Sequence, residues 1–179
     1  RHYLFLIPVL SLLAGWTFVK YCQSFLKQKK KTLLAKIVVV GAVFNILATI
    51  ATIAMIHPYE YAYYNELAGG LKGGVRYFEG DYWVNSVKES IAWIKHDRIK
   101  RSLKKAKITG AGHGLQFTHY FVSGMEYCPE DDKTWDYFIS NSRDHILSDE
   151  EQKLLVHTVS RMGAPLAWVF YRHTTAKTK

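Results

Sequence analysis

A short segment of the chain, residues 57–66, combines side chains that could bind a sugar. It reads HPYEYAYYNE and sets four tyrosines among a histidine, two glutamates and an asparagine. Aromatic rings stack on sugar faces, while carboxylates and amides form hydrogen bonds with hydroxyl groups. If Pro58 opens a helix, Tyr59 and Tyr63 share one face of it. The alternative is an aromatic belt at a membrane boundary. The candidate substrate-binding residues are His57, Tyr59, Glu60, Tyr63 and Asn65.

A glycine-rich run, AGGLKGG at 68–74, follows this segment. Its backbone amides could cradle a phosphate, with Lys72 and Arg76 adding positive charge. The Walker pattern of nucleotide-binding loops is missing, so the sequence favours an ordinary flexible connection.

Three further candidates for substrate binding come next, within the run VRYFEGDYW. They are Glu79, Asp81 and Trp83. The same residues are equally consistent with a packing seam between the C-terminal part of the chain and a membrane domain.

The remaining reactive residue types form no catalytic or metal-binding pattern. No nucleophile-elbow sequence is present, and the glycines at 110–114 lack the spacing of a nucleotide fingerprint, so they indicate a strand-end turn. The sequence therefore assigns no catalytic residue and no metal site. The scattered histidines considered are His113, His119, His145, His157 and His173.

Two apolar runs near the beginning of the chain are predicted to cross a membrane. Ile37 to Ile56 has 20 residues without a charge, and a helix rising ~1.5 Å per residue crosses a ~30 Å hydrocarbon core in that length. The other run covers about residues 3–20, with Pro8 near its start. A secretory signal peptide is the alternative there, but no small-residue cleavage site follows, which favours a spanning helix.

The charges between the two runs predict the orientation. Six lysines between Lys20 and Lys36, and no acidic residue, separate the runs. Lysine excess in a short loop marks the cytoplasmic side. We therefore expect loop 21–36 in the cytoplasm, an inner (plasma) membrane location, and everything after Ile56 outside. Cys22 and Cys128 then lie on opposite sides and are not expected to pair.

The net charge of +9 also invites a nucleic-acid interpretation. The lysines between the apolar runs are explained by topology, so nucleic acid is the least favoured partner. A second basic cluster, from Lys95 to Lys105, is expected to be a solvated helix end or a contact with lipid phosphates.

The rest of the chain is predicted to be an interfacial and amphipathic helical segment (57–105) followed by a small α/β domain (106–179). Ala106–Gly112, Tyr137–Ser140 and Leu166–Tyr171 are strand candidates, giving a sheet of three or four strands, partly parallel.

A capping box at Ser148 and Glu151 should open a helix that runs to about Met162, where Gly163 and Pro165 end it. A further helix is expected after its cap at Asn85 or Ser86, with an apolar face of Val87, Ile91 and Ile94.

The run HPYEYAYYNELAGGLKGGVRYFEGDYWVNSVKESIAWI resembles the region after the last membrane helix of bacterial family-39-type glycosyltransferases. These are multi-spanning GT-C enzymes related to the dolichyl-phosphate-mannose protein mannosyltransferases. The opening RHYLFLIP is similar to the Arg-Tyr-x-x-x-x-x-Pro entry to a late spanning helix of that family, with His2 an insertion or a substitution in that pattern. The resemblance covers Arg1 to about Ile94. Val84 stands where the family pattern has glycine, so a local turn is expected to differ.

The resemblance implies transfer of a sugar from a polyprenyl-phosphate donor to an envelope acceptor on the outer face. The family's catalytic aspartate lies in a first extracytoplasmic loop that this chain does not contain. The chain is therefore expected to be a C-terminal fragment, with two spanning helices of a larger bundle and a small α/β domain. Its expected partners are membrane lipid, the donor and the missing N-terminal membrane domain. Arg1 is expected to contact the donor phosphate.

A second hypothesis does not require an N-terminal catalytic domain. The same tyrosine-rich surface would suit a non-enzymatic, membrane-anchored module that binds envelope glycans or a partner protein. Further spans upstream of Arg1, with an acidic residue in the first outer loop, would favour the enzyme.

Overall fold

The computed structural model describes residues 6–27, 32–78, 80–110, 117–132, 134–141 and 147–172. It divides into two compact units, Arg1–Thr52 and Ile53–Lys179.

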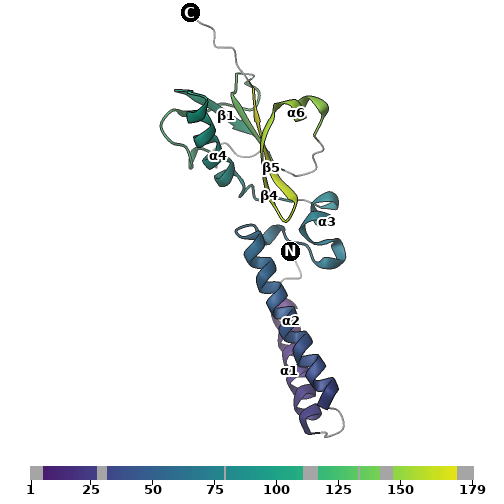
Figure 1. Cartoon of the computed structure of the whole chain (residues 1–179). Helices are drawn as coiled ribbons and strands as arrows, with labels where there is room; N and C mark the ends of the chain where they lie inside the picture. Colours follow the sequence, from purple (N-terminus) through teal and green to yellow (C-terminus); the bar gives the residue numbers. More distant parts are fainter. Residues whose placement is uncertain are drawn as a thin grey trace, which may run out of the picture. The chain divides into compact units, whose positions relative to one another are not determined.

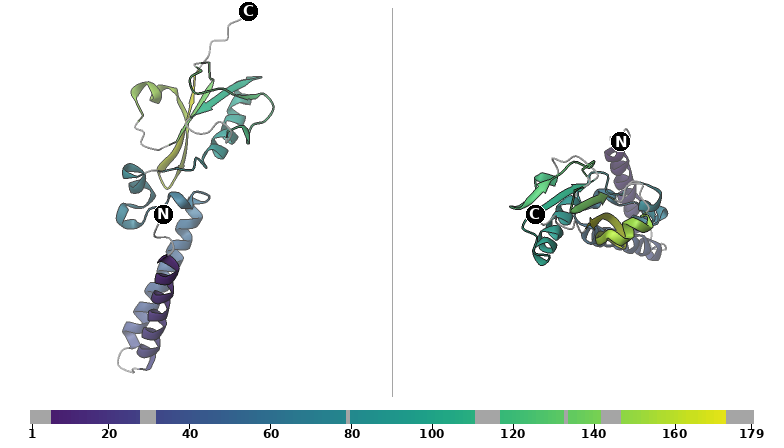
Figure 2. Two further views of the ribbon diagram at one scale, coloured as in Figure 1. Left: turned by 180° about the vertical axis from the view of Figure 1, so that it is seen from behind. Right: turned by 90° about the horizontal axis from the view of Figure 1, so that it is seen from above.

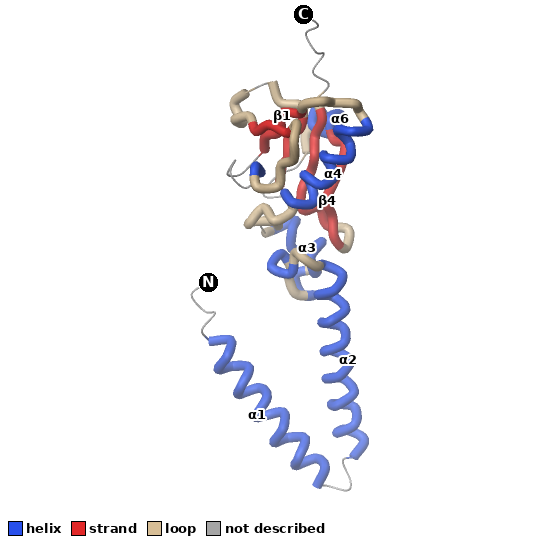
Figure 3. The backbone as a smooth tube through the Cα atoms, turned by 90° about the vertical axis from the view of Figure 1, so that its left-hand side faces the viewer, coloured by secondary structure: helices blue, strands red, loops and turns tan. Residues whose placement is uncertain are grey.

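The described residues of the first unit form two long helices (Figure 3). Helix α1 covers Leu6–Lys27 and α2 covers Thr32–Ile56, the last turn of which belongs to the second unit. Both are long and apolar enough to cross a membrane, over Leu6–Ser24 and Lys36–Ile56. Both continue into the stretch 21–36 that was expected to be a loop, because Leu, Lys and Gln are good helix formers.

The second unit is built on a five-stranded mixed sheet in the order β2-β1-β3-β5-β4 (Figure 1). Strand β1 is parallel to β2 and β3, whereas β5 is antiparallel to β3 and β4. The strands are β1 Ala106–Gly110, β2 Met125–Tyr127, β3 Tyr137–Asn141, β4 Leu155–Arg161 and β5 Ala164–Tyr171.

Helix α4 (Val87–Lys100) covers one face of this sheet against β3 and β5. Its predicted apolar face is confirmed, since Val87, Ile91 and Ile94 are all buried in the core. Tyr137 of β3 lies on the same face, and its hydroxyl donates to Asp97 Oδ2 of α4 at 2.9 Å. The amphipathic spacing of α4 therefore identified the face that closes the core.

The helix predicted to run from Ser148 to Met162 is wrong in its length. The capping box is present, but α6 ends at Leu154 (Asp149–Leu154), and the next residues form β4. Met162 and Gly163 have φ of 48° and 75° and reverse the chain, so that β4 pairs with β5 (Figure 2). Hairpin pairing with the buried strand β5, which follows directly, overrides the local helix signal. With β2, this raises the strand number above the three or four expected.

The glycine-rich run predicted to be a flexible connection is ordered structure. It contains η3 (Glu66–Ala68) and α3 (Gly70–Tyr77). A Cβ on Gly73 would lie 2.3 Å from the Ala68 carbonyl oxygen, and one on Gly74 would lie 2.1 Å from the Tyr64 ring. These glycines are therefore needed for close packing rather than for flexibility.

Candidate functional site

The residues that link α2 to α4 are part of the second unit's core. We call residues 57–86 the connecting segment. Ile56 at the end of α2, Tyr59 and Ala62 are each only 1% exposed and belong to the same buried cluster as the sheet. The connecting segment is therefore fixed to the α/β domain and does not act as a loose tether.

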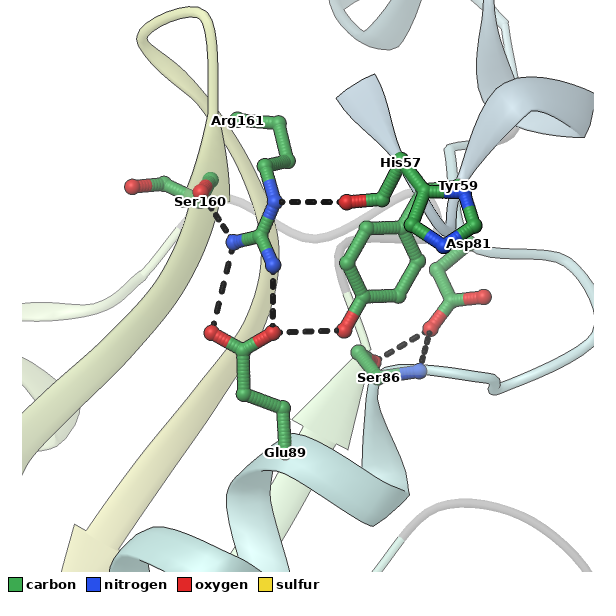
Figure 4. Close-up of polar contacts among 7 residues, drawn as sticks. All are labelled: His57, Tyr59, Asp81, Ser86, Glu89, Ser160 and Arg161. Atoms are coloured by element: carbon green, nitrogen blue, oxygen red, sulfur yellow. Dashed lines mark hydrogen bonds and ion pairs between the residues drawn. The ribbon is translucent and has the colours of Figure 1, made fainter. Parts of the chain in front are cut away.

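A group of polar contacts, drawn in Figure 4, joins three elements around Glu89 of α4. Arg161, at the end of β4, donates from Nη2 to Glu89 Oε2 at 2.7 Å and from Nη1 to Oε1 at 3.3 Å. Its Nε donates to the His57 carbonyl oxygen at 3.3 Å. The Tyr59 hydroxyl donates to Glu89 Oε2 at 2.9 Å, and the Arg161 guanidinium lies 4.9 Å from the Tyr59 ring centre. We call this group the Arg161 clamp.

The charges of the Arg161 clamp are set by its own contacts. Burial acts to raise the pKa of Glu89, but hydrogen bonds from Arg161 and Tyr59 outweigh it and the pKa is lowered. Burial and the neighbouring Glu89 raise the pKa of Tyr59. Glu89 is therefore ionised and Tyr59 neutral at physiological pH, an arrangement that suits structural support.

Tyr59, a candidate for substrate binding, lies in the core of the domain. Its ring is buried and its hydroxyl is used by Glu89. The prediction that Tyr59 and Tyr63 share a helix face is wrong, because residues 60–62 form only a short 3₁₀ turn, η2 (Glu60–Ala62). The Tyr63 hydroxyl instead donates to Glu66.

Asp81 is the most enclosed carboxylate among the described residues. It is 0% exposed and accepts hydrogen bonds from the backbone amides of Asn85 at 2.9 Å and Ser86 at 2.8 Å. The hydroxyls of Tyr61 and Ser86 also donate to it. Ser86 precedes α4 as predicted, but its hydroxyl binds Asp81 and does not cap the helix. Asp81 therefore closes the turn before α4, and its carboxylate is occupied by donors of its own domain.

Val84 lies in the turn that Asp81 closes. Its φ is 57°, in the left-handed region that a β-branched residue rarely adopts. This is the position at which the resemblance expects glycine. The turn therefore has a backbone conformation that glycine adopts without strain, although valine occupies the position.

Four of the candidate residues lie at the surface. His57 Nδ1 lies 2.6 Å from Glu60 Oε1, and the two side chains are 72% and 40% exposed. Hydrogen bonds from its own backbone and from His57 lower the pKa of Glu60, which keeps it ionised. Trp83 is exposed and packs edge-to-face on Tyr82, with ring centres 5.1 Å apart. Asn65 is also exposed, but its side chain caps η3 by accepting from the Ala68 amide at 3.1 Å.

Two candidates, Arg1 and Glu79, lie outside the described residues. Sequence reasoning in turn missed Glu89 and Arg161, the centre of the clamp. They are 72 positions apart, and no local pattern could have paired them, because the expected helix over 149–162 placed Arg161 on the wrong kind of element.

Three cations of the second basic cluster form contacts within the domain. Lys105 Nζ lies 2.7 Å from Glu126 Oε1, Arg101 pairs with Asp97, and Arg98 Nη1 donates to the Ser123 carbonyl at 2.9 Å. These contacts favour the solvated helix end over the lipid contact.

A shallow cavity of about 260 Å³ lies on the sheet face opposite α4. Phe138 and Phe170, adjacent in the β3–β5 register, form its floor. At the edge of the cavity, the guanidinium carbon of Arg172 lies 4.0 Å from the centre of the Trp135 ring. Glu150 and Glu151 of α6 complete a lining of rings, cation and carboxylates.

Metal ligation has no structural support in the described part of the chain. Among those residues, no group of three or more His, Cys, Asp or Glu side chains could hold a metal ion. Cys22 and Cys128 are both free thiols.

Comparison of the chain with protein-family models, curated proteins and solved structures gave no significant match.

Proposed function

We propose that this chain is the C-terminal part of an integral membrane glycosyltransferase of the inner membrane. It would transfer a sugar from a polyprenyl-phosphate donor to an envelope acceptor at the outer face, where the α/β domain lies. One observation carries the proposal: the end of a helix apolar enough to cross a membrane is built into the core of this domain. Arg161 and Glu89 hold His57 and Tyr59 there.

This construction suits a substrate that is tied to lipid. A lipid-linked sugar can react only near headgroup depth, so groups that bind it must be held close to the end of a spanning helix. His57 follows the last residue of α2 directly, and its ion pair with Glu60 presents a carboxylate to solvent. Glu60 accepts hydrogen bonds from acceptor hydroxyls, and Trp83 offers a ring for stacking. The catalytic base is contributed by the missing N-terminal domain, and Arg1 contacts the donor phosphate.

The test is sugar transfer from a polyprenyl-phosphate-hexose by membranes that contain the complete protein. Glu60→Gln should lower kcat/KM by about 10-fold or more, because a hydrogen bond to a charged group contributes roughly 1.5–3 kcal/mol. Glu126→Gln is the matched control, since Glu126 is also an exposed carboxylate in an ion pair. Wild-type transfer in both Glu60→Gln and Trp83→Ala, at equal protein level, would contradict the proposal.

The aromatic cavity favours a second candidate, a non-enzymatic membrane-anchored module that binds glycans. Trp135, Phe138 and Arg172 at its lining offer stacking surfaces and a cation for an acidic sugar. Binding of envelope glycan fragments that is lost in Trp135→Ala, together with no transfer by the complete protein, would favour this module over the enzyme.

A further inference from the structure

Exposed apolar side chains of the α/β domain are concentrated in the connecting segment. After Ile56, five large apolar side chains among the described residues are more than half exposed. Four of them lie between residues 67 and 83, and the fifth is Ile99. Single exposed apolar residues are ordinary, but a concentration of them marks an interaction surface. The four are Leu67, Tyr77, Phe78 and Trp83.

The backbone holds part of this surface in place. Leu67 lies in η3, which Asn65 caps, and its side chain is 98% exposed. Phe78 follows α3 and stacks on Tyr64 with ring centres 5.0 Å apart. The close approach of Gly74 to Tyr64 fixes α3 against the preceding turn. The outward position of Leu67 is therefore built into the fold.

Helix α3 adds two cations next to these apolar residues. Leu71 and Gly74 bury one side of α3, while Lys72 and Arg76 are exposed. Within the described part of the chain, neither cation forms a salt bridge with an acidic side chain. Tyrosine, leucine and basic residues together are typical of a protein surface at the headgroup region of a bilayer.

We propose that residues 65–78 contact the membrane surface at the end of α2. Leu67, Tyr77 and Phe78 enter the boundary between headgroups and acyl chains, and Lys72 and Arg76 bind the phosphates of anionic lipids. Leu67 follows Ile56 by 11 residues, which span at most about 40 Å when fully extended. The inference rests on the proposed crossing of the membrane by α2 and not on sugar transfer.

The cations favour lipid over a protein partner as the occupant. Basic side chains are attracted electrostatically to a leaflet that contains anionic lipids. An apolar interface with another membrane domain would not be stabilised by two exposed cations, because burying them there carries a desolvation penalty.

Site-specific photocrosslinking of the full chain tests this inference. A diazirine-bearing leucine analogue is placed singly at Ile46, Leu67 or Ile99, in vesicles of phosphatidylethanolamine and phosphatidylglycerol. Ile46 is an exposed residue of α2 and reports the membrane crossing, whereas Ile99 is an exposed aliphatic residue of α4. Mass spectrometry then counts lipid adducts. We expect adducts at 46 and 67 and at least about 10-fold fewer at 99.

The other outcomes overturn the inference in distinguishable ways. Adducts at 46 without adducts at 67, or a protein crosslink at 67, would show that lipid does not cover this surface. Adducts at all three positions would show that the contact is unspecific. No adducts at 46 would remove the proposed membrane crossing itself, and with it the proposed function.

A charge-reversed variant tests the part played by the cations. Lys72→Glu with Arg76→Glu should reduce lipid adducts at 67 several-fold in anionic vesicles. Adducts at 46 should stay unchanged, because α2 lacks these cations. Equal adducts at 67 before and after charge reversal would overturn the role of the two cations.

Discussion

Two carboxylates of the connecting segment, Asp81 and Glu60, share a similar sequence context but not a similar environment. Each stands among aromatic residues, and each was a candidate for sugar binding. Asp81 is 0% exposed and accepts four hydrogen bonds, whereas the Glu60 side chain is 40% exposed and pairs with His57. The comparison teaches that an acidic residue beside tyrosines acquires its role from the donors that the fold brings to it.

Removal of the buried carboxylate should have the largest effect. Asp81→Ala leaves two backbone amides and two hydroxyls without their acceptor, which should cost about 3 kcal/mol in the free energy of unfolding. Urea unfolding in detergent and faster amide exchange at Asn85 and Ser86 measure this. Asp131→Ala, at an exposed aspartate, is the control. If Asp81→Ala kept full stability and lost only sugar transfer, Asp81 would return to the substrate site.

Loss of the Arg161 clamp should have the next largest effect. Arg161→Met removes a two-bond pairing with Glu89 and a hydrogen bond to the His57 carbonyl. Because the pair is only partly buried, we expect a loss of about 1–2 kcal/mol. Amide exchange should rise at Tyr59, next to the end of α2. Lys100→Met, at an exposed cation of α4, should change neither quantity.

The charge on Glu89 should appear as a pH dependence of stability. Its pKa in the folded protein is lowered below the ordinary value of 4.5. The unfolded chain therefore binds the proton more readily, so the stabilisation is complete above about pH 4.5 and is lost as the pH falls through the lower folded value. The stability difference between wild type and Glu89→Gln should shrink over that range. A constant difference would exclude Glu89 as its source.

Relief of the strained turn should produce the smallest change. Val84→Gly loses partly buried methyl groups but removes a left-handed conformation that costs a β-branched residue about 1–2 kcal/mol. Val75 of α3 is likewise partly buried against the core, with an ordinary helical backbone. Val84→Gly should therefore cost at least about 1 kcal/mol less than Val75→Gly in urea unfolding. Equal costs would mean that the turn carries no strain.

Local patterns predicted the elements that depend on local chemistry. The two apolar helices, the buried face of α4, the strands around Ile108, Ile139 and Val169, and the capping box at Ser148 all follow from periodicity or from contacts within a few residues. Each of these signals depends on residues that lie close together in the sequence, so it can be recognised without knowledge of the fold.

The tertiary structure decided the rest, because sheet pairing and burial set the outcome there. Leu155–Arg161 forms a strand because β5 supplies its hydrogen bonds, and Asp81 is structural because Tyr61, Asn85 and Ser86 converge on it. Arg161 meets Glu89 only after β4 has joined the sheet. Burial and pairing between segments far apart in the chain are collective properties, and the amino-acid sequence displays them only through the folded molecule.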